Sequence, residues 1–211
     1  MILEMEPLTR ERRRQMTRHA LVNAAARLFA ERGFAGASLD DIAAAAGFTR
    51  GAIYSNFPAG KDDLMLGVAD HLVAEQERIM FEAVSQVPDD PGAAIELAVE
   101  LWQRIATEHR DFVRLQLEVR LHALRNPAFR ERLAALEAEQ AERQIQTQQV
   151  LLDAQGRDSS VPLWEFTILA RAANEGLHQL AAIDAGNLDR YVRVVRLMFQ
   201  LEDSLMEPRE R

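Results

Sequence analysis

The chain has 211 residues, and its apolar fraction of 48% is enough to bury the core of one large domain or two small ones. It contains no cysteine, which excludes disulfides and thiolate metal sites and suits a reducing compartment. No window approaches the roughly 18 apolar residues that a membrane-spanning helix needs. We therefore expect a cytoplasmic protein with no membrane partner.

Charge is unevenly distributed along the chain. The formal net charge is −8, yet residues 7–61 hold nine basic and four acidic side chains, so this segment carries +5 and the remainder carries −13. Such asymmetry predicts a small polyanion-binding module attached to a larger acidic part. The simpler alternative is a charged helix end that only meets solvent.

Apolar residues recur at helical spacing in nearly every segment, and no segment alternates as a strand does. The sequence therefore predicts an all-α fold. Beyond residue 60 the expected helices are long, and Pro- and Gly-containing stretches separate them. Their expected ranges are 61–86, 92–107, 110–125, 127–153, 162–183 and 187–205.

Three shorter helices are predicted before residue 60. The first runs from a cap at Thr17 to Gly33. The second begins at Ser38, which a carboxylate follows three residues later, as in a capping box. The third begins with a capping hydroxyl at Thr49. Two short helices joined by a glycine-containing turn and braced by a longer helix form a helix-turn-helix unit, whose second helix enters the DNA major groove.

The sequence GFTRGAIYSNF, residues 47–57, is the expected recognition helix. Its arginine, Arg50, has a planar fork that can bond bidentately to guanine, and Gly51 allows a close approach to the groove. The apolar residues expected to anchor the helix are Phe48, Ile53 and Phe57. The residues expected to face outward are Arg50, Gly51, Ala52, Tyr54, Ser55 and Asn56.

Residues 14–66 resemble the TetR family of bacterial transcriptional regulators. The resemblance rests on AARLFAERGF at 25–34 and on the pattern Gly-x-[Ser/Thr]-x-x-x-[Leu/Ile]-Tyr-x-x-Phe shortly before Lys61. It implies a helix-turn-helix DNA-binding domain over 8–60 and a ligand-binding and dimerisation domain over 61–207. The DNA-contacting positions that it implies are Arg18, Ser38, Thr49, Arg50, Gly51, Ala52, Tyr54, Ser55, Asn56 and Lys61.

The chain departs from the family pattern in two places. One additional residue stands between Phe57 and Lys61, and Asn56 occupies a position that is often histidine. The first departure puts the phosphate contact expected of Lys61 in doubt. Ahead of the motif, residues 10–14 contain four arginines that form either a DNA-contacting arm or a disordered tail.

The resemblance also implies that the last two helices pack against their copies in a homodimer. Apolar stripes on 162–183 and 187–205 suit a four-helix interface, although packing inside one chain is the alternative explanation. A dimer would present two recognition helices about 34–36 Å apart to a palindromic duplex. The expected interface residues are Phe166, Leu169, Ala173, Leu177, Leu180, Tyr191, Val195 and Met198.

The middle helices mix large apolar residues with a few polar ones, as ligand pockets do. Glu118 and His122 lie one turn apart and could recognise an amine or a hydroxyl. The alternative is a structural hydrogen bond at the edge of the core. The expected pocket residues are Phe81, Trp102, Phe112, Leu115, Gln116, Glu118, Val119, His122, Phe129 and Trp164.

Glu175 and His178 form a Glu-x-x-His sequence of the kind that di-iron bundles use, but no second such motif completes the set. We therefore expect no catalytic residue, metal site or cofactor, and we expect His178 to be a core or interface residue. The predicted function is that of a dimeric repressor that leaves its DNA operator when a small-molecule effector of unknown identity binds. An activator, a ligand-independent DNA-binding dimer, and an all-α metal-dependent enzyme or ligand carrier are the alternatives.

Overall fold

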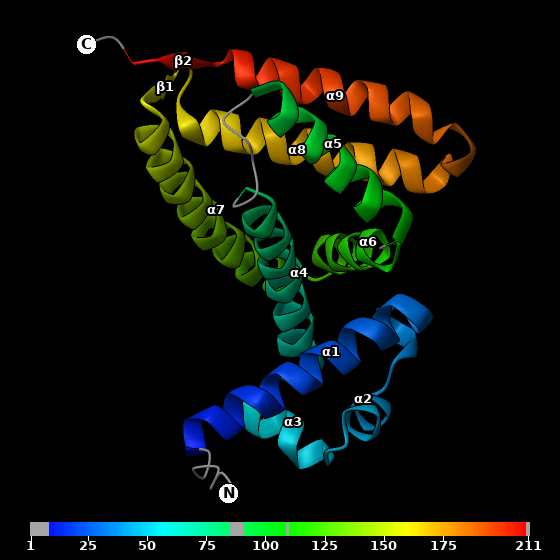
Figure 1. Cartoon of the computed structure of the whole chain (residues 1–211). Helices are drawn as coiled ribbons and strands as arrows, with labels where there is room; N and C mark the ends of the chain where they lie inside the picture. Colours follow the sequence, from blue (N-terminus) through cyan, green and yellow to red (C-terminus); the bar gives the residue numbers. More distant parts are fainter. Residues whose placement is uncertain (1–8, 85–90, 109, 210–211) are drawn as a thin grey trace, which may run out of the picture. The chain divides into compact units, whose positions relative to one another are not determined.

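The computed structural model describes the backbone of residues 9–84, 91–108 and 110–209, and within these ranges all side chains except those of 77, 80–84, 91, 108 and 110. Helices dominate the described residues (Figure 1), which confirms the predicted all-α fold. The helices are α1 (Arg10–Gly36), α2 (Leu39–Ala46), α3 (Arg50–Asn56), α4 (Lys61–Val84), α5 (Pro91–Glu108), α6 (Arg110–Arg125), α7 (Pro127–Gln155), α8 (Leu163–Ile183) and α9 (Leu188–Ser204).

The first helix starts earlier than predicted. Thr9 caps α1 by accepting a hydrogen bond from the backbone amide of Arg12, whereas the hydroxyl of Thr17 donates to a carbonyl inside the helix. The arginine-rich residues 10–14 are therefore the exposed first turns of α1, and the disordered-tail alternative is wrong. Near the other end, Gly33 takes a left-handed backbone conformation (φ 71°) that kinks α1.

The second helix has the predicted capping box. The backbone amide of Asp41 donates to Oγ of Ser38 over 3.1 Å, and the carboxylate of Asp41 accepts from the amide of Ser38. Gly47 ends α2 in the left-handed conformation. Thr49 precedes α3, but its hydroxyl makes no capping hydrogen bond, contrary to expectation.

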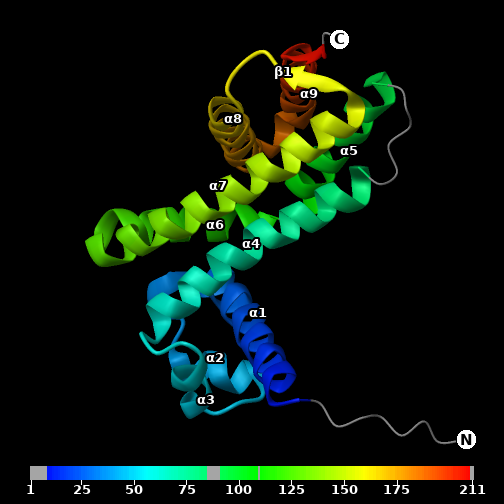
Figure 2. The same ribbon diagram turned by 90° about the vertical axis from the view of Figure 1, so that its left-hand side faces the viewer.

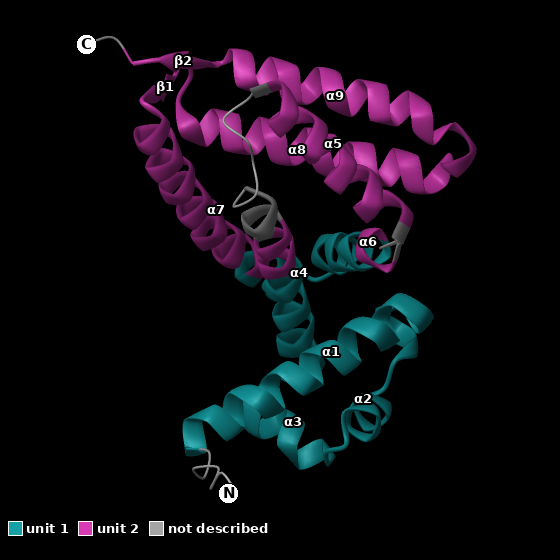
Figure 3. Cartoon of the chain, in the orientation of Figure 1, with its two compact units in different colours: residues 1–72, 114–132 teal, residues 73–113, 133–211 magenta. Residues whose placement is uncertain are grey.

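The chain divides into two compact units (Figure 3). Unit 1 comprises Met1–Leu72 and Arg114–Arg132, and unit 2 comprises Val73–Val113 and Leu133–Arg211. These units differ from the sequence-based division at residue 60, because the start of α4 and most of α6 group with α1, α2 and α3. The reason is chemical, since side chains of α6 bond to α1 and α4.

The core of unit 1 joins α1, α2 and α3 to α4. Phe29 of α1, Ile42 of α2, Ile53 of α3 and Leu64 of α4 are all fully buried. A Cβ at Gly67 of α4 would lie 3.1 Å from Val22 and 3.2 Å from Phe57, so the glycine lets α4 pack closely on this core. The short helices α2 and α3 are thus held by burial rather than by their own length.

In unit 2, α5, α8 and α9 pack against one another (Figure 2) and share a core. The buried members of this core are Val99, Trp102, Ala106, Ala181 and Val195. Two short strands, β1 (Arg157–Ser159) and β2 (Met206–Pro208), pair in antiparallel register with Asp158 opposite Glu207. These strands were not predicted. Among the residues described, no helix has the length and apolarity needed to cross a bilayer.

Candidate nucleic-acid interface

The outward face of α3 carries polar and small side chains. Arg50, Gly51, Tyr54 and Ser55 are exposed, and Ala52 is half-buried, as predicted for a helix that approaches a groove. Ile53 and Phe57, in contrast, are buried and fasten the helix. A Cβ at Gly51 would meet nothing closer than the hydroxyl of Thr49 at 3.7 Å, so packing within the chain does not require this glycine.

Arg50 is the first residue of α3, and two neighbouring side chains hold its guanidinium. Its Nη1 lies 3.0 Å from Oδ2 of Asp40 on α2, and its Nη2 donates to the hydroxyl of Tyr54 over 3.4 Å. The hydrogen bond to Tyr54, together with the negative charge of Asp40, raises the pKa of Arg50. The guanidinium is consequently a fixed positive charge on the outward face.

The last residues of α3 depart from the prediction. Asn56 does not face outward: its side chain is buried, and its amide donates to the carbonyl of Ala52 over 2.8 Å. Arg18 donates to the backbone carbonyl of Asn56, and its guanidinium lies 4.3 Å from the ring centroid of Phe57. Arg18 therefore stabilises the carboxyl end of α3, where a cation is favoured.

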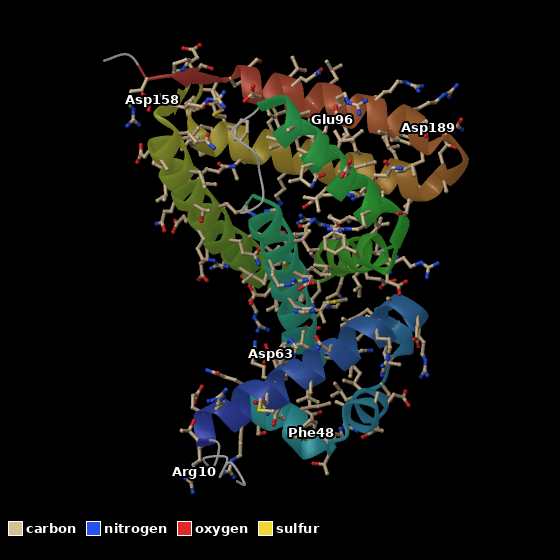
Figure 4. All side chains as sticks on the ribbon, in the orientation of Figure 1. Arg10, Phe48, Asp63, Glu96, Asp158 and Asp189 are labelled. Carbon is tan, nitrogen blue, oxygen red and sulfur yellow. The ribbon has the colours of Figure 1, made fainter. Side chains whose placement is uncertain are left out.

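Phe48 was expected to anchor the recognition helix but does not. It lies in the turn between α2 and α3 (Figure 4), and 38% of its surface is exposed. The chain turns at Gly47, so Phe48 sits outside the helical repeat that buries Ile53 and Phe57.

Two more of the expected DNA-contacting residues have partners inside unit 1. Ser38 serves the capping box of α2. The ammonium of Lys61, at the start of α4, lies 4.5 Å from the ring centroid of Phe34, and burial lowers its pKa. The phosphate contact of Lys61 stays a prediction, while Thr49 is exposed and available.

Glu118 and His122 were expected to line a ligand pocket, but both have structural partners in unit 1. Oε2 of Glu118 accepts the backbone amide of Phe34 over 3.0 Å. Nε2 of His122 lies 2.9 Å from Oδ1 of Asp62, and its ring lies 4.0 Å from that of Phe34. The alternative of a structural hydrogen bond is the one that this geometry supports.

The other pocket candidates are divided between the two units. Leu115, Val119 and Phe129 are buried in unit 1, and Gln116 there is half-buried. In unit 2, Trp102 is buried, Phe112 is half-buried and Trp164 is 57% exposed. The side chain of Phe81 lies outside the described residues.

Trp102 and His178 stack in the core of unit 2, with ring centroids 4.7 Å apart. Nδ1 of His178 lies 3.0 Å from the carbonyl of Asn174, and burial lowers the pKa of the histidine. His178 is therefore a core residue. Among the described residues, no group of three or more potential ligands is arranged to hold a metal ion.

The expected interface residues lie partly in the core of unit 2. Phe166 and Val195 are buried, and Leu177 and Tyr191 pack against the core. Ala173 and Met198 are half-buried. The apolar side chains that are exposed on α8 and α9 form a different set, which includes only two of the predicted residues. This set is Trp164, Ile168, Leu169, Leu180, Ile183, Val194, Leu197 and Leu201.

At 100° per residue, the exposed apolar residues of α8 lie opposite its buried residues Phe166, His178 and Ala181. On α9 they lie on the side away from Val195. Sequence reasoning missed most of them because each helix carries two apolar stripes. The spacing of Trp164, Ile168 and Ala172 was a usable signal for the second stripe.

Three helices packed around one core, with a turn at Gly47 and an exposed polar face on α3, form a helix-turn-helix unit, the architecture of many DNA-binding domains. Residues 21–68 match the family model described as "Bacterial regulatory proteins, tetR family". Over this segment the chain therefore resembles the TetR family of bacterial transcriptional regulators.

Among the curated relatives, two are 34% identical to the chain over the residues that they match. One is the HTH-type transcriptional regulator AcrR of Shigella flexneri, matched over 109 residues, 51% of this chain and 49% of that protein. The other is EthR of Mycolicibacterium smegmatis, matched over 83 residues, 39% of this chain and 38% of that protein. The chain thus spans about half or less of the length of the curated relatives it matches.

Solved structures resemble the fold over most of the chain. A TetR-family regulator from Rhodococcus sp. superimposes with a TM-score of 0.70 at 18% identity, over 92% of this chain and 100% of that one. Salmonella enterica GusR gives a TM-score of 0.62 at 23% identity, over 93% and 96% of the two chains. These likenesses show that the shared fold extends beyond residues 21–68.

Proposed function

We propose that the protein is a homodimeric repressor that binds a palindromic operator through α3 and is released by a small-molecule effector. The observation that carries the proposal is the exposed face of α3, where Arg50, Tyr54 and Ser55 surround Gly51 on a helix anchored by Ile53. An arginine on such a face is suited to guanine, and the hydroxyls are suited to phosphates.

The exposed apolar residues of α8 and α9 support the dimer. Ile183 is 83% exposed, Leu169 63% and Leu201 58%, and large apolar side chains gathered on two neighbouring helices mark an interaction surface. A twofold interface uses the same surface on both subunits, so one such face is sufficient.

Helix α6 offers a physical route for effector release. It begins in unit 2 and continues through unit 1, where Glu118 and His122 bond to the end of α1 and the start of α4. An effector that prefers one position of α6 would thereby change how the DNA-binding helices are held, because it shifts the population toward that state.

Gel-shift titration with the DNA flanking the protein's own gene tests this function. We expect binding at low salt that Arg50→Ala weakens and that an effector found by thermal-shift screening reverses. Absence of binding at low salt would overturn the proposal. A DNA affinity that no ligand in the screen changes would favour a ligand-independent DNA-binding dimer instead.

A further inference from the structure

Asp40 and Arg50 form an ion pair between the two helices of the helix-turn-helix. The atoms Oδ2 and Nη1 are 3.0 Å apart, and the two side chains remain 67% and 53% exposed, respectively. Tyr54 receives a second hydrogen bond from the same guanidinium. Since a guanidinium has five N–H donors, the two contacts orient it and leave others available to a base.

The capping of α2 does not use the Asp40 carboxylate. Asp41 closes the capping box with Ser38 and also pairs with Arg32 at 3.5 Å. Asp40 is exposed in the first turn of α2. The helix dipole favours an acidic side chain at this end of the helix, and Asp41 already provides one. Asp40 therefore places a negative charge beside Arg50, on the side proposed to face DNA, and the capping of α2 does not require this charge.

A carboxylate beside the recognition helix opposes DNA phosphates whatever the sequence. It also neutralises part of the arginine charge that would otherwise bind any phosphate, so it weakens sequence-independent binding. Bidentate pairing with guanine depends less on net charge and more on the orientation of the guanidinium fork. Holding that fork before binding reduces the entropy lost when it meets the base.

We propose that Asp40 is a specificity-determining residue, which positions Arg50 for base reading and disfavours binding to unselected sequences. The inference rests on the proposed DNA-binding function and assigns a role to a residue of α2 rather than of α3. The exposed ion pair contributes little to the stability of the fold, so the role of Asp40 depends on how it orients Arg50.

The test compares two duplexes bound by the full-length protein. One is enriched by the wild-type protein from a random-sequence library, and the other is a shuffled duplex of the same composition. Asp40→Asn keeps the size of the side chain and removes its charge. We expect it to tighten binding to the shuffled duplex about threefold and to lower the affinity ratio of the two duplexes about tenfold.

Glu31→Gln is the matched control, because Glu31 is an exposed carboxylate on α1 and its loss changes the charge by the same amount. We expect Glu31→Gln to change the affinities for the two duplexes by the same factor, so that their ratio is unaltered. In an Arg50→Ala background, Asp40→Asn should also leave the ratio unaltered. Circular dichroism would verify that each variant keeps the helical content of the wild type.

Two results would overturn the inference. The first is that Asp40→Asn changes the affinities for both duplexes by the same factor. The second is that Asp40→Asn changes the affinity ratio as much in the Arg50→Ala background as it does in the wild-type protein. The proposed function has its own test. If the wild-type protein enriches no duplex from the library, the proposal of DNA binding is overturned, and the proposed role of Asp40 is overturned with it.

Discussion

Glu118 accepts a hydrogen bond from the backbone amide of Phe34, which lies 84 residues earlier in the chain. The amide is available because Gly33 leaves the helical conformation, and a Cβ on Gly33 would approach Oε1 of Glu118 to 3.1 Å. The kink in α1 and the carboxylate on α6 therefore fit each other. The contact links α6 to α1, and most of α6 belongs to the same compact unit as α1, α2 and α3.

We expect Glu118→Ala to lower the free energy of unfolding by about 1–3 kcal/mol, because it leaves a half-buried amide without its acceptor. Glu118→Gln retains an acceptor oxygen and should lose less than half as much. Urea denaturation measures both variants. Equal losses in the two variants would show that the charge, rather than the hydrogen bond, stabilises the junction.

Arg50→Ala should weaken binding to an enriched duplex by about 1–3 kcal/mol, the value of a good bidentate base contact. Its effect on a shuffled duplex should be much smaller. Arg27→Ala, which removes an exposed arginine from α1, is the charge-matched control. Gel-shift titrations at one salt concentration provide the comparison, and an equal loss on both duplexes would assign Arg50 to phosphates instead.

Ile183→Asp should convert the proposed dimer into a monomer. The side chain is 83% exposed in the single chain, so the change costs little in the monomer but buries a charge in an apolar interface. Val150→Asp, at a 67% exposed site on α7, is the matched control. Sedimentation at micromolar concentration distinguishes the species. A wild-type monomer, or a dimer that persists in Ile183→Asp, would contradict the proposed interface.

The sequence was most informative where local chemistry decides the structure. Ser38 and Gly47 correctly marked both ends of α2, because capping depends on neighbouring residues alone. The start of α1 was misplaced because Thr9 and Thr17 are both plausible caps, and an arginine-rich segment shows little apolar periodicity. The two strands, each of three residues, are too short for a pattern to reveal.

Tertiary packing decided the features that the sequence did not reveal. Periodicity cannot distinguish the core stripe of Phe166 from the exposed stripe of Ile168, since both repeat at helical spacing. Nor could it indicate that Glu118 and His122 face α1 and α4 rather than a ligand. Asn56 turned inward because Arg18 and Phe57 close the end of α3.

The burial of Glu202 on α9 predicts that the stability of the protein depends on pH. Burial raises the pKa of its carboxyl from 4.5 to about 7. The folded state therefore binds this proton more tightly than the unfolded state, and the stability contribution is fully present below pH 4.5. It is lost as the pH rises toward about 7, because the unfolded chain ionises first.

Glu202→Gln should remove this dependence, since the amide stays neutral throughout. At pH 8 the variant should be more stable than the wild type by roughly 2 kcal/mol, and below pH 4.5 the two should be nearly equal. Glu207→Gln, an exposed carboxylate on β2, is the control and should leave the pH profile unchanged. Urea denaturation from pH 4 to 8 measures all three proteins. The contrary result would be a wild-type free energy of unfolding that rises between pH 5 and 7, with no such rise in Glu202→Gln. That result would reverse the predicted sign and show that the ionised Glu202 has a favourable partner.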